Sequence, residues 1–175
     1  MPWITQKCFP MIMVEESTNE EGDVEPGKFS ITQSCVFMSE ETRSVLWPIH
    51  VKYRTSSGKT GEFVFSSRSI DIEIPDLEQD EAVWFNLDML GFYIPIPSGP
   101  YLYEKILPNL DSFSGADQYG ILLVISRMFG DASVWELLPD FRNSDSLAVK
   151  YLADELSNRL QLQKNYTPAP RFQNE

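Results

Sequence analysis

Histidine and cysteine are both scarce in this sequence of 175 residues. It contains one histidine, His50, and two cysteines, Cys8 and Cys35. A self-contained zinc site of the Cys/His kind needs four such ligands, so we expect this chain to hold neither a metal ion nor another cofactor. Two cysteines do not make a disulfide framework, and we expect both to be free, buried thiols.

Basic residues are also few. The 14 Lys and Arg side chains stand against 26 Asp and Glu side chains, which gives a formal net charge of −12. A protein that binds duplex nucleic acid needs a basic face, and an anionic membrane surface attracts basic segments. We therefore expect neither of these as a partner.

Long apolar runs are missing as well. The longest, residues 121–125, has five residues, whereas a membrane-spanning helix needs about 20. The first six residues lack the basic and apolar regions of a secretory signal. We expect no membrane span. The compartment stays unknown, with the cytoplasm slightly favoured.

Alternation of apolar and polar residues is typical of half-buried strands, and it runs through residues 1–98. Turn signals such as residues 56–58 separate the runs. About seven short strands at this spacing predict an antiparallel sandwich or barrel, and we adopt an all-β sandwich. The apolar faces of the expected strands are formed by Phe29, Ile31, Gln33, Cys35 and Phe37, by Ile49, Val51 and Tyr53, by Phe63 and Phe65, by Ile70, Ile72 and Ile74, and by Val83 and Phe85.

Two segments are expected to interrupt the strands. Residues 15–27 contain six acidic side chains, which repel one another and favour a mobile, solvated loop. Pro95, Pro97 and Pro100 are expected to stop the last strand and to mark the boundary with a second unit.

Helical patterns follow over residues 99–165, and residues 166–175 are expected to form a loose tail. We expect a short helix from Tyr101 to Leu107, ended by Pro108. Residues 116–129 predict a helix that is apolar nearly all round and must be covered on all sides.

Two further helices complete this segment. Residues 132–138 are expected to be helical and to end at Pro139, and Asn143 or Ser144 is expected to cap the last helix. Together the helices resemble the start of an α-solenoid. We expect them to leave an exposed apolar patch that involves some of Leu147, Tyr151, Leu152, Leu156 and Leu160.

No set of residues forms a convincing active site. The alternation places His50 beside Lys52 and Arg54 on a solvent-facing side, without a local carboxylate partner. The acidic residues between Asp71 and Glu81 match no calcium loop, and we interpret them as a solvated strand edge and loop. A glycosidase carboxylate pair is the alternative for that cluster.

Several motifs occur in a specific order. Residues 3–10 follow Trp-x-x-Gln-x-x-aromatic-Pro, residues 47–51 begin with Trp-Pro-Ile, and residues 84–93 contain Trp-Phe-Asn and then Gly-Phe-Tyr. This order resembles the zinc aminopeptidase family of aminopeptidase N, the puromycin-sensitive enzyme and the endoplasmic-reticulum aminopeptidases, in the part that follows the catalytic domain. The matching positions are Trp3, Gln6, Pro10, Gln33, Trp47, Trp84, Asn86, Gly91, Tyr93 and Asp117.

The departures from the family pattern also matter. Cys8 stands where the family usually has Gly, Ile94 and Pro95 replace a frequent Arg-Val, and Gln118 stands where Arg is usual. We therefore expect a polar link between the sandwich and the helices to be missing. The family's His-Glu-x-x-His and Gly-x-Met-Glu-Asn motifs are absent from the chain, so no catalytic residue is carried over.

The resemblance implies a non-catalytic portion of a zinc aminopeptidase, in which the zinc belongs to the full-length parent. It would be a spacer between the catalytic and C-terminal helical domains that helps to shape the peptide cavity. The alternative is a free-standing, inactive scaffold related to that family, and an enzyme based on the acidic cluster is a weaker third reading. The expected partners are the remaining domains of the parent chain, or a second copy bound through the apolar helices.

Overall fold

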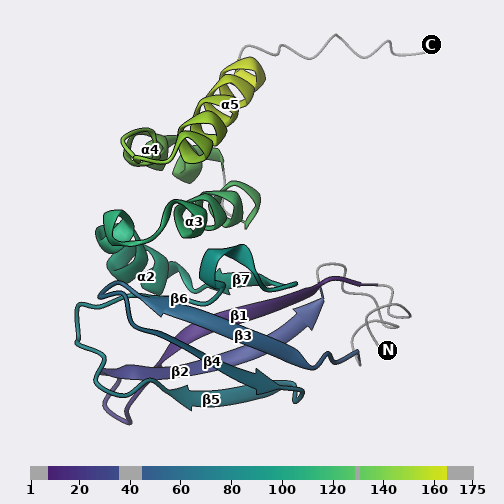
Figure 1. The fold of residues 1–175 in the computed structure, drawn as a ribbon, viewed down its shortest axis with the longest axis vertical. Coiled ribbons are helices and arrows are strands. Elements are labelled where there is room, and N and C mark those ends of the chain that lie inside the picture. Colours follow the sequence, from purple (N-terminus) through teal and green to yellow (C-terminus); the bar gives the residue numbers. More distant parts are fainter. Residues whose placement is uncertain (1–7, 36–44, 129–130, 165–175) are drawn as a thin grey trace, which may run out of the picture.

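Strands occupy the first part of the chain and helices the second (Figure 1). The computed structural model describes residues 8–35, 45–128 and 131–164, and within these ranges it leaves the side chains of residues 128, 131–133 and 162–164 undescribed. The described strands form two sheets of four and three strands. The prediction of a β-rich part followed by helices is therefore confirmed.

The larger sheet has the strand order β5-β2-β1-β7. Strands β1 (Pro10–Thr18) and β2 (Val24–Cys35) are antiparallel, and β5 (Ser69–Glu73) is antiparallel to β2. Strand β7 (Ile94–Pro97) instead runs parallel to β1. This parallel edge departs from the predicted antiparallel sheet.

The smaller sheet has the order β4-β3-β6 and is antiparallel. Strands β3 (Ile49–Thr55) and β4 (Thr60–Phe65) form the predicted hairpin, and β6 (Val83–Trp84) adds two residues on the other side of β3. The turn needs Gly58, whose φ of 89° is a conformation that other residues rarely adopt.

The alternating residues form the core as predicted. Phe29, Ile31, Gln33 and Cys35 are all buried along β2, and Ile49 and Val51 are buried along β3. Phe37 lies outside the described residues.

Helical residues complete this core. The Phe29 ring lies 5.1 Å from Phe85 and 5.5 Å from Tyr101, and the Tyr101 hydroxyl donates to the Val83 carbonyl at 3.0 Å. A purely all-β sandwich is therefore too narrow a description, because residues from both parts of the chain share one buried cluster. The division at residue 98 stays a prediction.

The predicted acidic loop over residues 15–27 is wrong. Strand β1 continues to Thr18 and β2 begins at Val24. The Asn19 side chain closes the short turn, since its oxygen accepts from the Glu21 and Asp23 N–H groups at 2.9 Å each. The acids at the turn are exposed, so water screens their repulsion and the hairpin forms.

The prediction that Pro95, Pro97 and Pro100 stop the last strand is correct for its end and wrong for Pro95. Strand β7 ends at Pro97 and the helix α2 (Gly99–Tyr101) follows with Pro100 in its first turn, but Pro95 lies inside β7, which pairs with β1 along one side only. The Ser98 N–H donates to the Val14 carbonyl of β1 at 2.8 Å. Because alternate residues face opposite sides of a strand, the two proline nitrogens face away from β1 and no ladder bond is lost.

The segment after β7 is helical through Ser112. Helix α2 (Gly99–Tyr101) continues as a π-helical turn, η2 (Leu102–Ile106), and then as the 3₁₀ helix η3 (Leu107–Ser112). The short helix is thus confirmed, but Pro108 does not end it. Pro108 lies just after the junction of η2 and η3, where the helix type and its hydrogen-bond pattern change.

Helices α3 (Gly115–Met128), α4 (Asp131–Arg142) and α5 (Leu147–Lys164) pack on one another above the sheets (Figure 1). The predicted α3 is confirmed, and Ile121, Leu122 and Ile125 are buried. None of the helices in the described ranges is long and apolar enough to cross a bilayer.

Two helix boundaries differ from the prediction. Pro139 lies inside α4 and does not end it, because the buried Leu138 and Phe141 on either side anchor the last turn in the core. Helix α5 begins at Leu147, later than an Asn143 or Ser144 cap would place it. The Ser144 hydroxyl instead accepts from the Ser146 N–H in the preceding turn, at 3.1 Å.

The prediction of free thiols is wrong, since Cys8 and Cys35 form a disulfide. Strand pairing explains the contact. Pro10 lies opposite Cys35 in the β1–β2 register, so Cys8, two residues before β1, meets the end of β2, with the two Cα atoms 5.9 Å apart. That separation suits a disulfide.

We expect replacement of both cysteines by serine to lower the free energy of unfolding by about 3 to 4 kcal/mol. The disulfide closes a loop between residues 27 apart in the sequence, and loop-closure entropy gives roughly this value. Urea unfolding of the oxidised protein, the reduced protein and the double variant measures it. An equal midpoint for all three would contradict the stabilising role.

We expect Trp84→Ala to cost about 3–5 kcal/mol of stability, because its indole is buried. His50 is exposed, with its Nε2 3.0 Å from a Glu62 carboxylate oxygen, so His50→Ala should cost less than about 1 kcal/mol. Urea midpoints of the two variants compare them. The reverse order would contradict the assignment of strand faces.

Candidate functional site

The residues singled out from the sequence fall into two groups in the structure. Trp3 and Gln6 lie outside the described residues. Gln33 and Trp47 contact each other, and Pro10 is buried where β1 begins, opposite Cys35. The others, which are Trp84, Asn86, Gly91, Tyr93 and Asp117, gather where the sheets meet α3.

Gln33 and Trp47 form a buried polar contact between the two sheets. The Trp47 backbone N–H donates to Gln33 Oε1 at 2.8 Å. Gln33 Nε2 donates to the Trp47 carbonyl at 3.2 Å and to the Ser67 carbonyl at 2.6 Å. Both side chains are nearly inaccessible to water. The glutamine therefore satisfies backbone groups in the core and ties β2 to the segment before β3.

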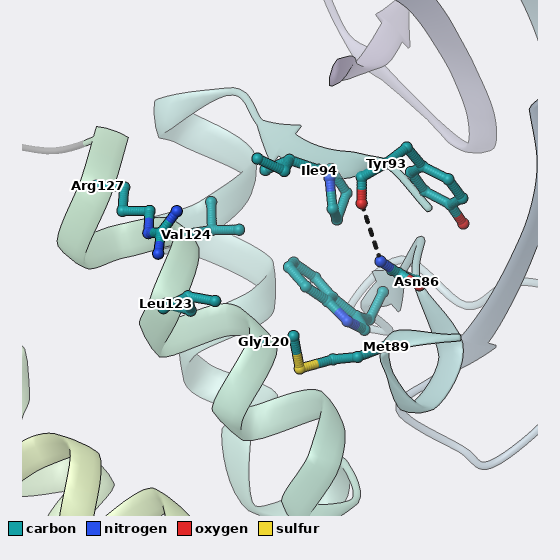
Figure 2. A pocket seen from close by; sticks show the side chains of 10 residues that line it. Asn86, Met89, Tyr93, Ile94, Gly120, Leu123, Val124 and Arg127 are labelled. Atoms are coloured by element: carbon teal, nitrogen blue, oxygen red, sulfur yellow. Dashed lines mark hydrogen bonds between the residues drawn. The ribbon is translucent and has the colours of Figure 1, made fainter. Parts of the chain in front are cut away.

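Asn86 closes the loop that leads from β6 to β7. Its Oδ1 accepts from the Gly91 N–H at 2.7 Å, and its Nδ2 donates to the Tyr93 carbonyl at 3.1 Å (Figure 2). A Cβ atom at residue 91 would overlap the Tyr93 ring, which explains the glycine. The loop conformation thus depends on all three residues.

A charged cluster links this loop to β3 and α3. We call it the Arg54 bridge and define it as Arg54, Asp88, Ser114 and Asp117. Arg54 donates to Asp117 Oδ2 at 2.6 Å and to Asp88 Oδ2 at 3.1 Å. The Asp88 N–H donates to Asp117 Oδ1 at 2.6 Å, and the Ser114 hydroxyl donates to Asp88 Oδ1 at 2.8 Å. The expectation of a missing polar link is therefore wrong.

Asp117 is the buried centre of this bridge, and its side chain is 0% exposed. Burial raises the pKa of its carboxyl above the ordinary value, while the Asp88 N–H, the Arg54 guanidinium and Ser114 lower that pKa. A buried carboxylate is costly unless it is paired and hydrogen-bonded. The bridge supplies both kinds of partner.

The bridge also holds a strained piece of backbone. Asp88 and Met89, in the 3₁₀ helix η1 (Leu87–Met89), have φ values of 51° and 57°. Side chains other than glycine's adopt such values rarely, and they persist only where the surroundings impose them. Here the hydrogen bonds of Asp88 impose them, so sequence patterns alone had no way to indicate Asp88 or Arg54.

Gln118, which departs from the family pattern, has a separate role. Its Nε2 donates to the Leu110 and Phe113 carbonyls at 3.1 Å each, and its Oε1 accepts from the Ser144 hydroxyl. It therefore ties α3 to the end of η3 and to the turn between α4 and α5. An arginine there could donate but not accept.

An apolar groove of about 70 Å³ lies beside the bridge, between α3 and the segment from β6 to β7 (Figure 2). Polar groups along it are few. We call it the α3 groove. Its lining residues are Trp84, Asn86, Met89, Tyr93, Ile94, Pro95, Gly120, Leu123, Val124 and Arg127.

The candidate catalytic and metal-binding residues from the sequence lie within the described ranges. These ranges contain no group of three or more His, Cys, Asp or Glu side chains placed to hold a metal ion. His50 does have a carboxylate partner, Glu62, contrary to the sequence interpretation, but both are exposed and Lys52 lies 3.5 Å from the same carboxylate. The acids from Asp71 to Asp80 that flank the buried Ile74 are exposed on a strand edge and loop.

The chain matches no known protein-family model and no curated protein. Its geometry is that of a structural joint, in which buried polar side chains fix a loop and a helix against two sheets.

We expect Arg54→Ala to lower the free energy of unfolding by about 3–5 kcal/mol, because it leaves the buried Asp117 carboxylate without its cation. Lys52→Ala, two residues earlier on the same strand and half exposed, is the matched control and should cost less than about 1 kcal/mol. Urea unfolding of both variants measures the difference. Equal losses would contradict the importance of the bridge.

Proposed function

We propose that this chain is a non-catalytic portion of a zinc aminopeptidase, a spacer that holds a C-terminal helical domain at a fixed position relative to the catalytic domain. The observation that carries the proposal is the Arg54 bridge. A spacer must transmit orientation, and the bridge joins a strand, a loop and a helix through charged hydrogen bonds to one buried carboxylate. In this role the chain would shape the cavity that admits peptides.

The family-like residues support the same proposal. Gln33 with Trp47, and Asn86 with Gly91 and Tyr93, form buried contacts that stabilise the fold. This is what a resemblance confined to a non-catalytic portion implies. The parent enzyme would provide the zinc.

A free-standing scaffold related to the same family is the alternative, and exposed apolar side chains on α5 favour it. Leu147 is 81% exposed and Tyr151 is 72% exposed on adjacent turns. Leu152, Leu156 and Leu160, which were also candidates for an exposed patch, are buried. The patch is thus smaller than the full set of candidates, and it suits contact with a further domain or a second copy.

Sequencing of the full transcript separates the two proposals. An in-frame His-Glu-x-x-His upstream of residue 1 would support the spacer. A reading frame that starts at Met1 and stops after Glu175 would contradict the spacer and favour the scaffold.

We expect the purified chain to release no amino acid from peptide substrates and to bind no stoichiometric zinc. Catalytic zinc needs three protein ligands and an open position, and the sequence has one histidine. Metal analysis after dialysis against zinc, with an aminopeptidase assay, tests this. One tightly held zinc ion per chain would contradict it.

We expect the chain to self-associate weakly through Leu147 and Tyr151, because exposed apolar side chains on one helix face favour contact with a partner. Sedimentation velocity at several concentrations should show a rising average mass. The double variant Leu147→Glu/Tyr151→Glu should stay monomeric, while Val64→Glu, which changes an exposed residue of β4, should behave like the unmodified chain. A strictly monomeric unmodified chain would contradict this role of α5.

A further inference from the structure

An apolar stripe runs along the outer face of the larger sheet, the face that is turned away from the core. Alternate residues of a strand face opposite sides of the sheet. In β1 and β7 the residues Ile12, Val14, Pro95 and Pro97 are buried, so the residues between them face outward. We call these outward residues and their neighbours the β1–β7 stripe, which consists of Phe9, Met11, Met13, Phe92, Ile94 and Ile96.

The stripe is continuous across the two strands. Met11 lies opposite Ile94, and Met13 lies opposite Ile96, on strands that are about 4.8 Å apart. Just before these pairs, the rings of Phe9 and Phe92 contact each other edge to face, with their centroids 4.6 Å apart. Three successive rungs of the β1–β7 ladder are therefore apolar on both strands.

Water reaches this stripe. Phe92 is 65% exposed and Met13 is 45% exposed, and the other four side chains are partly exposed. The rest of the outer face has the polar side chains that are typical of a solvated sheet face. They are Ser30, Thr32 and Ser34 on β2 and Ser69, Asp71 and Glu73 on β5. The stripe departs from this pattern, as the contact surface for another protein does.

The direction of the strands indicates what kind of element fits the stripe. Strands β1 and β7 form a parallel pair, and parallel strands are found almost only where both faces are covered, as a rule by helices. The core covers the inner face of this pair. From Phe9 to Met13 the stripe is about 13 Å long, at about 3.3 Å per residue. A helix with a pitch of 5.4 Å matches this length in two to three turns.

The charges beside the stripe indicate the chemistry of that helix. Glu15 follows Met13 on the same face of β1 and is exposed. It lies opposite Ser30, which in turn lies opposite the exposed Asp71. Lys28 on the same face already pairs with Glu25 at 2.6 Å. Together with the net charge of −12, these acids favour a partner with basic side chains.

We propose that the β1–β7 stripe docks an amphipathic helix of another protein. The apolar side of that helix lies on the stripe, and its lysine or arginine side chains lie beside Glu15 and Asp71. The proposal goes beyond the spacer function, because the stripe is on the outer face of the larger sheet, whereas the Arg54 bridge joins the smaller sheet to α3. It is also separate from the contact expected on α5.

Methyl NMR with defined peptides tests the proposal, since Met11, Met13, Ile94 and Ile96 all carry methyl groups that can be labelled with carbon-13. The probe is acetyl-Lys-Leu-Ala-Lys-Leu-Leu-Lys-Lys-Leu-Ala-Lys-Leu-amide, which places its leucines on one side of a helix. One control peptide has the same residues in an order that does not separate Leu from Lys, and a second has Glu in place of every Lys.

We expect the probe to cause saturable shifts at the Met11, Met13 and Ile96 methyl groups and none at Ile49, which is buried in the other sheet. Each control peptide should bind at least fivefold more weakly. An absence of saturable shifts at the stripe would overturn the proposal. Equal binding of the reordered peptide would overturn the requirement for an amphipathic helix, and equal binding of the Glu peptide would overturn the requirement for basic side chains.

Variants locate the site. Met13→Glu should weaken binding of the probe at least tenfold, although it adds a charge that attracts lysine, because it interrupts the apolar stripe. Phe92→Ser, at the other end of the stripe, should weaken binding severalfold. Val64→Glu is the matched control, since it adds the same charge at an exposed residue of the smaller sheet, and it should leave binding within twofold. Amide dispersion checks that each variant is folded. Unchanged binding by Met13→Glu and Phe92→Ser, or an equal loss in Val64→Glu, would overturn the assignment to the stripe.

Discussion

One buried carboxylate organises the joint between the strands and the helices. Asp117 opens α3, yet its two oxygens are bound by a guanidinium from β3 and a backbone N–H from η1. Because a charge in the core is tolerated only with all its partners in place, α3 has little freedom to shift or rotate on the sheets. The conformation of the Asp88–Met89 backbone, and with it the edge of the α3 groove, depends on the same contacts.

Local sequence patterns were sufficient to predict the buried faces of strands and helices in which apolar residues recur at a regular spacing. Alternation located the buried face of β2 at Phe29 and Ile31, and the apolar circumference of α3 located Ile121 and Ile125. Trp84 and Phe85 show the limit of that reasoning. Trp84 ends β6 and Phe85 follows it, and both are buried, because α3 covers the side of β6 on which Trp84 lies.

Those patterns could not predict which distant residues pair with each other. The disulfide of Cys8 follows from the register that brings Pro10 opposite Cys35, and Arg54 reaches an aspartate 63 positions later. Likewise the acidic residues after Val14 predicted a loop, because the sequence did not indicate that the Asn19 side chain closes a tight turn there. Each of these contacts depends on a partner that sequence spacing does not identify. The motif residues of the candidate site, Asp117 among them, were located, but Arg54, the cation that pairs with Asp117, was not.

The prolines of β7 determine how the larger sheet ends. The nitrogens of Pro95 and Pro97 face outward and carry no hydrogen, so this edge has no N–H donors to offer an incoming strand. Another chain cannot extend the sheet there through a regular ladder, and edge-to-edge aggregation is blocked on that side. A protein that met this edge would have to bind through side chains, which are more selective than a backbone ladder that any extended segment can join.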